Sequence, residues 1–316
     1  MNTQLQILLQ QGIQAFENGN FERAESILNK VINIDVKNLS AFEILGLIKA
    51  SEGKYLEASE FFGRAARINP KDAIIRYNLA KSLHDVGSLK DSISHHKKAV
   101  ELAPNNPKAW LNYGKTLLDL SQYEEALVCF NQALKLAADY DEALINKAVT
   151  LNELKRFDEA ITNYDQVLSL KPDYAVAWFN KGNILYELQH FDEAITHYDQ
   201  ALSLNQDFAD AWLNKGNTLI ELKYFDEAIT HYDKVLSLKP DDADAWFYKG
   251  VALNELKQYD KAIKHFNKAL SIKEDITWAL GALLHAKMKI CDWANFDNSL
   301  EKFYKELILN LSLIHI

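Results

Sequence analysis

Residues 191–199 read FDEAITHYD, and residues 225–233 repeat this stretch unchanged, 34 positions further along the chain. The segments just before them are also near copies, WFNKGN from residue 178 and WLNKGN from residue 212. Self-similarity at a fixed period of roughly 20 to 50 residues is typical of solenoid repeat proteins. The same period divides most of the chain, without an insertion, into eight blocks that begin at Leu5, Leu39, Ala73, Pro107, Asp141, Ala175, Ala209 and Ala243.

Each block has the pattern of two helices joined by a short turn. In the second half of one block, Ala194, Ile195, Tyr198 and Leu202 recur at helical spacing. A helix often ends at a glycine in the left-handed conformation, so a glycine after the first helix of a block predicts its end. A proline cannot continue a helix, so a proline after the second helix predicts the end of that helix. The residues that are expected to end the helices are Gly19, Gly53 and Gly87 for the first helix, and Pro70, Pro104, Pro172 and Pro240 for the second. Side chains beside the prolines are expected to cap the following helix, namely Asn105, Asn106, Asp173, Asp241 and Asp242.

Glycines inside the first helix need a packing reason, because glycine there costs about 1 kcal/mol relative to alanine. Each lies twelve residues before a small residue, which predicts a close helix crossing between two small side chains. The pairs are Gly46 and Ala58, Gly114 and Ala126, Gly182 and Ala194, Gly216 and Ala228, and Gly250 and Ala262. The large aromatic residues are then predicted to fill the space between neighbouring repeats.

This order of Trp, Leu, Gly, Tyr, Ala, Phe, Ala and Pro at fixed offsets resembles the tetratricopeptide repeat (TPR) family. The resemblance implies an all-α fold, an α-solenoid (TPR superhelix) of eight 34-residue helix-turn-helix repeats over residues 5–276. Residues 277–310 are expected to form a degenerate capping helix pair, or the start of a linker. The sequence departs from the pattern at Lys147, Lys181, Lys215 and Lys249, where the family has Leu, and at Leu89 and Ser92 in the third repeat.

Composition and charge exclude several classes of partner. The formal net charge is −9, which argues against binding the phosphates of nucleic acid. No apolar run approaches the roughly 20 residues that a membrane helix needs, so no membrane partner is expected. The N-terminus does not resemble a secretory signal, and the two cysteines do not form a disulfide framework, so we expect a cytoplasmic location.

No constellation in the sequence predicts catalysis. His95, His197, His231 and His265 occupy one equivalent position, but equivalent atoms of stacked helices lie about 8–10 Å apart, too far to share a metal. The acidic pair Asp158-Glu159 recurs at the start of second helices, where carboxylates complement the helix dipole. The sequence therefore predicts no catalytic residue, no metal, no cofactor and no enzymatic activity for these 316 residues.

A row of asparagines is the candidate binding site. One asparagine recurs in the first helix of five repeats, where packing does not require it, and amides in register can bind the main chain of an extended guest polypeptide or partner protein in the concave groove. The row is Asn78, Asn112, Asn146, Asn180 and Asn214. A second, acidic row of Glu142, Asp210 and Asp244 could select Thr, Ser or basic side chains, or merely cap helices. The alternative is that polar residues on a solvated face simply recur because repeats duplicate.

The two rows also resemble the superhelix of the O-linked N-acetylglucosaminyltransferase family and its bacterial relatives. In that family asparagine and aspartate ladders hold the substrate polypeptide, and a Cys-Asp-Trp segment follows the last repeat. Here Cys291, Asp292 and Trp293 stand at that place. The resemblance implies a substrate-recruiting arm whose catalytic domain is absent from this chain; the alternative is a free-standing TPR scaffold or adaptor for protein-complex assembly. Residues 311–316 look like a translated sequencing adapter, so we expect a non-native tail there.

Overall fold

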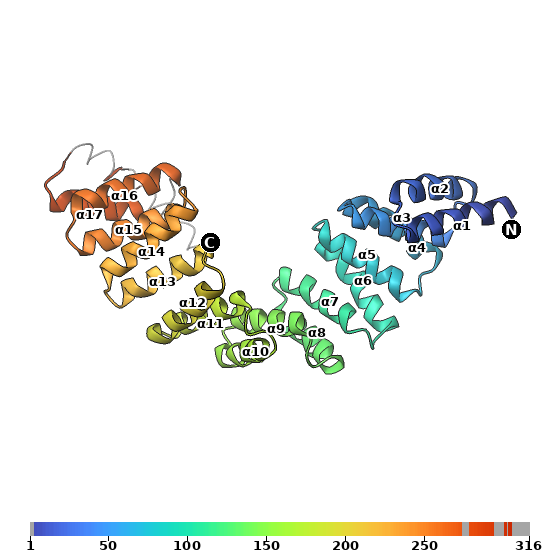
Figure 1. Cartoon of the computed structure of the whole chain (residues 1–316), viewed down its shortest axis with the longest axis horizontal. Coiled ribbons are helices and arrows are strands. Elements are labelled where there is room, and N and C mark those ends of the chain that lie inside the picture. Colours follow the sequence, from blue (N-terminus) through green and yellow to red (C-terminus); the bar gives the residue numbers. More distant parts are fainter. Residues whose placement is uncertain (1–2, 274–277, 294–299, 302, 305–316) are drawn as a thin grey trace. The chain divides into compact units, whose positions relative to one another are not determined.

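The computed structural model of the chain describes residues 3–273, 278–293, 300–301 and 303–304 (Figure 1). Within these residues it contains seventeen α-helices and no β-strand, which confirms the all-α repeat fold. The predicted tail at 311–316 lies outside the described residues. The helices are α1 (Thr3–Glu17), α2 (Phe21–Ile34), α3 (Leu39–Ser51), α4 (Tyr55–Ile68), α5 (Ala73–Asp85), α6 (Leu89–Leu102), α7 (Pro107–Asp119), α8 (Tyr123–Leu136), α9 (Asp141–Glu153), α10 (Phe157–Leu170), α11 (Ala175–Glu187), α12 (Phe191–Leu204), α13 (Ala209–Glu221), α14 (Phe225–Leu238), α15 (Ala243–Glu255), α16 (Tyr259–Ile272) and α17 (Ala279–Lys289).

The helices pair as the 34-residue period predicts. From α3 to α15, every odd-numbered helix begins at the first residue of a block. Gly19, Gly53 and Gly87 have φ values of 73°, 73° and 88°, as expected for left-handed residues that end a helix. Five later repeats place a residue with a Cβ atom in the same conformation, namely Ser121, Lys155, Gln189, Lys223 and Lys257.

The chain divides into two compact units, Met1–Leu170 and Lys171–Ile316. Odd-numbered helices contact one another along each unit, α5 with α7 and α7 with α9 in the first, α11 with α13 and α13 with α15 in the second. Even-numbered helices make no contacts of that extent among the described residues. The odd-numbered helices therefore lie on the inner side of each unit, and we call their surface facing away from the even-numbered helices the inner face.

The mid-helix glycines make room for an aromatic ring, which corrects the predicted crossing of two small residues. A Cβ atom added at Gly46 would lie 2.7 Å from the ring of Phe62, and one added at Gly182 would lie 2.7 Å from the ring of Tyr198. The rings come from the second helix of the same repeat and are buried. They pack within their own repeat and also against the next one, as Phe62 does with Ile75 and Leu79 of α5, so the predicted packing of large aromatic residues between neighbouring repeats is confirmed.

The tryptophans tie each repeat to the turn that precedes it. The indole Nε1 of Trp178 donates to the backbone oxygen of Pro172, and Trp110, Trp212 and Trp246 make the same bond to the residue six positions earlier. Arg76 takes this place in the third repeat, where its Nε donates to the backbone oxygen of Pro70 at 3.1 Å. The atypical repeat thus keeps the same link through a different side chain.

Two of the lysines that depart from the family pattern, Lys215 and Lys249, form ion pairs between repeats. The Nζ atom of Lys215 lies 2.6 Å from a carboxylate oxygen of Asp199, on the second helix of the preceding repeat. Lys249 pairs with Asp233 in the same way. The side chain of Lys215 is only 14 % exposed, and a lysine can bury its aliphatic part while its charge meets a carboxylate.

Helix α17 covers the last repeat of the second unit. Its buried Leu280, Leu283 and Leu284 pack in one apolar cluster with Phe266 of α16. Most of the second helix predicted for this cap lies outside the described residues. Among the helices that the structure describes, none combines the length and the apolar character that a bilayer span requires.

Candidate functional site

The five asparagines predicted as a binding row all lie on odd-numbered helices and are half-buried. Asn78, Asn112 and Asn146 lie on α5, α7 and α9 of the first unit, and Asn180 and Asn214 on α11 and α13 of the second. Hydrogen bonds between neighbouring odd-numbered helices place Asn112 and Asn214 on the inner face. The other three occupy the equivalent position of their repeats, so the row follows the inner face of each unit.

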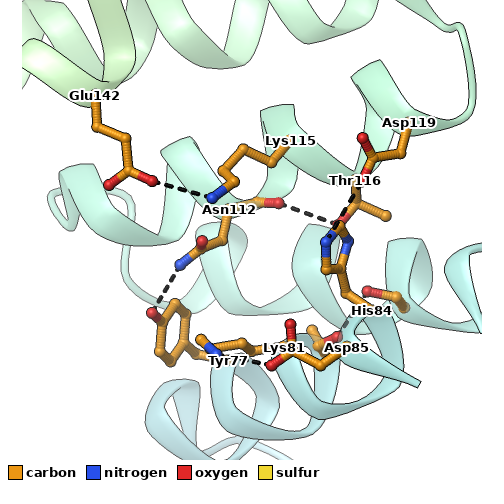
Figure 2. A network of polar contacts seen from close by, with 11 residues as sticks. Tyr77, Lys81, His84, Asp85, Asn112, Lys115, Thr116, Asp119 and Glu142 are labelled. Carbon is orange, nitrogen blue, oxygen red and sulfur yellow. Dashed lines mark hydrogen bonds and ion pairs between the residues drawn. The ribbon is translucent and has the colours of Figure 1, made fainter. Parts of the chain in front are cut away.

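In the first unit, the amides of two of these asparagines are held by hydrogen bonds to the protein. The Nδ2 group of Asn112 donates to the Tyr77 hydroxyl on α5 at 2.7 Å (Figure 2). The Nδ2 group of Asn146 donates to the backbone oxygen of Glu142 on its own helix. Asn78 makes no side-chain hydrogen bond within the described residues. The amide oxygens of all three therefore remain available as acceptors for a guest.

Two pairs of opposite charges on the inner face of the first unit compensate one another. The Nζ atom of Lys115 lies 3.0 Å from a carboxylate oxygen of Glu142, and Lys81 pairs with Asp85 at 2.7 Å (Figure 2). Burial, with the neighbouring Tyr140 and the charge of Glu142, raises the pKa of Tyr77 to about 12, although the bond from Asn112 acts in the opposite direction. The Tyr77 hydroxyl is therefore neutral at ordinary pH.

In the second unit, the asparagine row is joined by a second row that the sequence analysis missed. The Nδ2 group of Asn214 donates to Asn183 Oδ1 at 2.8 Å, and that oxygen also accepts from the Tyr198 hydroxyl at 3.0 Å. The Tyr232 hydroxyl donates to Asn217 Oδ1 at 2.8 Å. Asn183 and Asn217 follow the predicted row by three residues, a spacing that places side chains on one helix face. Their recurrence at the period of 34 was the signal that could have found them.

The predicted acidic row proves to be heterogeneous. Glu142 is paired with Lys115, and Asp210 with Lys239 at 2.9 Å, whereas Asp244 has no ion pair within the described residues. The alternative that these carboxylates cap helices is wrong. The N-caps of their helices are Tyr140, Phe208 and Asp242.

Further carboxylates make the inner face of the second unit acidic. The exposed Glu187 and Glu221 end α11 and α13, and neither has an ion pair within the described residues. The pKa of Tyr186 is raised by burial first, and then by the charge of Glu221 and by Tyr248 and Glu187. The half-buried tyrosine thus lies in the negative field of these glutamates.

Three histidines of the predicted row pack against tryptophans, whereas the Nδ1 atom of the fourth, His95, lies 3.0 Å from Arg76 Nη1. The ring of His231 lies 5.2 Å from that of Trp212 in the same repeat, measured between centroids, and His197 and His265 pair with Trp178 and Trp246 in the same manner. Burial and the nearby Lys215 charge lower the pKa of His231 to about 4. His231 therefore contributes neutral aromatic packing.

Known protein families and proteins match this chain in its repeats. Family models described as TPR repeat match residues 149–189, 182–223 and 216–257, and models described as tetratricopeptide repeat match 45–107, 97–128 and 243–276. A tetratricopeptide repeat protein 21 homolog of Caenorhabditis briggsae is 33% identical over 89 residues, which are 28% of this chain. The match spans only 7% of that protein's own length.

Two solved structures are similar to the chain. The APC/C hetero-tetramer Cut9-Hcn1 matches with a TM-score of 0.59 at 19% identity, over 84% of this chain and 52% of that one. YrrB, a TPR protein with an unusual peptide-binding site, matches with a TM-score of 0.50 at 24% identity, over 59% of this chain and 96% of that one. The repeat models together cover more than half of the residues, and the helix pairs have the period they describe. The chain therefore belongs to the tetratricopeptide repeat family.

Proposed function

We propose that the inner face of this TPR protein binds an extended, basic polypeptide. The observation that carries the proposal is the row of half-buried asparagines, whose amide groups are only partly used by the protein itself. A main chain that has left water must replace its hydrogen bonds, and amide side chains can both donate to it and accept from it. Solenoids present long concave surfaces that suit an extended guest.

Charge supports a basic guest. The chain has a formal net charge of −9, and the inner face of the second unit carries Glu187, Glu221 and Asp244 without an ion pair in the described residues. Lysine or arginine side chains of a guest would supply the missing partners, and such complementarity raises association rates and specificity. YrrB, which shares the fold, has a peptide-binding site, although that likeness by itself concerns the fold alone.

A narrower form of the proposal makes this chain the substrate-recruiting arm of an O-GlcNAc-transferase-like protein. It rests on the asparagine row and on Cys291, Asp292 and Trp293, which follow directly after α17. The alternative is a scaffold or adaptor for complex assembly, working in the cytoplasm. The intact gene distinguishes the two, because a glycosyltransferase domain encoded after residue 310 supports the arm and an early stop codon supports the scaffold.

Binding can be tested with the full chain and a fluorescein-labelled peptide of alternating lysine and serine, about twelve residues long. Replacing Asn146→Ala and Asn180→Ala together should raise the Kd for this peptide roughly tenfold, since each lost amide bond contributes about 0.5–1.5 kcal/mol. The melting temperature should stay nearly unchanged, because neither side chain bonds to another helix.

The matched control replaces exposed amides on even-numbered helices, Gln166→Ala with Gln200→Ala, which should leave the Kd unchanged. A peptide of alternating glutamate and serine should bind far more weakly than the basic one. Equal binding of both peptides would refute the charge argument, and normal binding by the asparagine variant would refute the proposed site.

A further inference from the structure

Two buried tyrosines of the second unit reach across their repeats to the inner face. Tyr198 and Tyr232 lie on the even-numbered helices α12 and α14 and are 1% and 0% exposed. Their hydroxyls donate to Asn183 Oδ1 at 3.0 Å and Asn217 Oδ1 at 2.8 Å, on α11 and α13. Each bond therefore ties a side chain of the repeat interior to an amide of the inner face.

These bonds decide which way the amides point. An amide oxygen that accepts from a tyrosine hydroxyl turns its own Nδ2 hydrogens away from that hydroxyl. Asn183 Oδ1 accepts a second bond from Asn214, which uses its remaining acceptor capacity. Asn183 therefore keeps only donors for a guest, whereas Asn214 keeps its oxygen as an acceptor. The main chain of a guest carries both N–H donors and C=O acceptors. It can therefore form hydrogen bonds with an inner face whose donors and acceptors have fixed directions.

The hydroxyls remain donors at ordinary pH. Burial raises the pKa of Tyr198 and of Tyr232 above the usual tyrosine range, so both hydroxyls stay protonated. Thr218 lies beside the Tyr198 hydroxyl as a second neighbour, but the Thr218 hydroxyl itself donates to the backbone oxygen of Asn214. Asn183 is the geometrically defined acceptor.

Other repeats of the same chain show that the fold does not need this arrangement. Where the second helix has Phe62, Phe130 or Phe266 in place of the tyrosine, the position of Asn183 is taken by Leu47, Lys115 or Val251. None of these three side chains can accept a hydrogen bond. The repeat with Tyr164 has Val149 there, so a buried tyrosine at this position does not require an asparagine at the Asn183 position. A valine at the Asn183 position thus has a precedent within the chain, beside a tyrosine in one repeat and beside a phenylalanine in another.

We propose that Asn183 and Asn217 form a second row of amides that donates to the main chain of the guest, and that Tyr198 and Tyr232 are its positioning residues. The inference rests on the proposed function, because it assumes that a polypeptide occupies the inner face. It adds the residues that set the direction of the amides in the second unit.

A double-mutant cycle on the full chain tests the inference with the labelled lysine-serine peptide. Tyr198→Phe with Tyr232→Phe should raise the Kd several-fold, roughly threefold to tenfold, because the amides lose their fixed orientation. Asn183→Val with Asn217→Val should raise it at least as much. Combining all four changes should cost nothing beyond the valine pair, since the tyrosines act only through the asparagines.

Controls separate positioning from a general loss of structure. Tyr164→Phe, in the repeat without such an asparagine, should leave the Kd unchanged. In the free protein, the side-chain amide resonances of Asn183 and Asn217 should shift in the tyrosine variant while the helical spectrum is retained. An unshifted resonance, an unchanged Kd, or a tyrosine effect that persists beside the valines would overturn the inference.

The failure of the inference can be distinguished from that of the proposed function. If Asn146→Ala with Asn180→Ala weakens binding but the tyrosine variant does not, the proposed function survives and the second row is wrong. If the unmodified chain does not bind the peptide, both proposals are wrong.

Discussion

His96 is a residue whose surroundings leave its polar atoms unsatisfied. It takes the place that Phe62 and Phe130 occupy in other repeats, it is fully buried, and its ring stacks on Tyr113 with centroids 5.9 Å apart. Both ring nitrogens lack a hydrogen-bond partner among the residues that the structure describes. A neutral imidazole carries one N–H group, and leaving such a group buried and unpaired costs about 1–3 kcal/mol.

Replacing His96→Phe should therefore raise the free energy of unfolding by about 1–2 kcal/mol at pH 7. The larger ring has a precedent, because Tyr164 packs in a repeat whose glycine is replaced by Ala148, just as Ala80 replaces it here. Urea denaturation of both proteins measures the difference. A variant less stable than the parent would show that the imidazole fits its site better than a phenyl ring.

The same pair of proteins tests the pH dependence. Burial, with the neighbouring His84 and His95, lowers the pKa of His96 to about 3 from an unfolded value near 6.5, so the unfolded chain takes up this proton first. The parent should lose stability relative to the variant as the pH falls below about 6.5, by at most about 1.4 kcal/mol per pH unit. Above that pH the difference should be constant. A difference independent of pH down to 4 would contradict the lowered pKa.

At the scale of the element, the turn inside each repeat shows a conformation that recurs with different residues. Gly53 has a φ of +73°, and a Cβ atom there would meet nothing within 4 Å. Gln189 holds the equivalent place with a φ of 62°. A residue with a Cβ atom pays about 1 kcal/mol for this region, so the later repeats carry a strain that the first three avoid.

Gln189→Gly should accordingly stabilise the chain by about 0.5–1 kcal/mol, less the greater freedom that glycine has when unfolded. The reciprocal change, Gly53→Ala, should destabilise it by about 1 kcal/mol, and for backbone reasons alone, because the space around it is open. Thermal and urea unfolding measure both. Destabilisation by Gln189→Gly would mean that the glutamine side chain makes a contribution of its own.

The positions of the helices can be predicted from the sequence pattern, whereas the contacts between helices cannot. The period of 34 predicts where the odd-numbered helices from α3 onward begin, because duplicated residues repeat their caps and turns. It does not identify the partner of a side chain, so the glycines were assigned to small residues when they face aromatic rings. Asn183 was overlooked for the same reason, since its partner Tyr198 comes from another helix. Such pairings depend on how two helices pack, which periodicity alone does not specify.

At the scale of the whole molecule, the two units differ in which carboxylates of their inner faces are paired with lysines. In the first unit, Lys115 neutralises Glu142, and Lys81 neutralises Asp85 (Figure 2). In the second unit, the carboxylates that end α11 and α13 have no such partners among the described residues. A basic guest should therefore bind to the second unit with the stronger salt dependence, since exposed charges are screened by salt.

The most direct test of the central claim is a nuclear magnetic resonance titration of the full chain with the lysine-serine peptide, following the side-chain amides. We expect the resonances of Asn78, Asn112, Asn146, Asn180 and Asn214 to shift on binding, together with those of Asn183 and Asn217. The outer amides of Gln166 and Gln200 should stay in place. Shifts confined to the outer glutamines, or binding that leaves the asparagines unmoved, would contradict it.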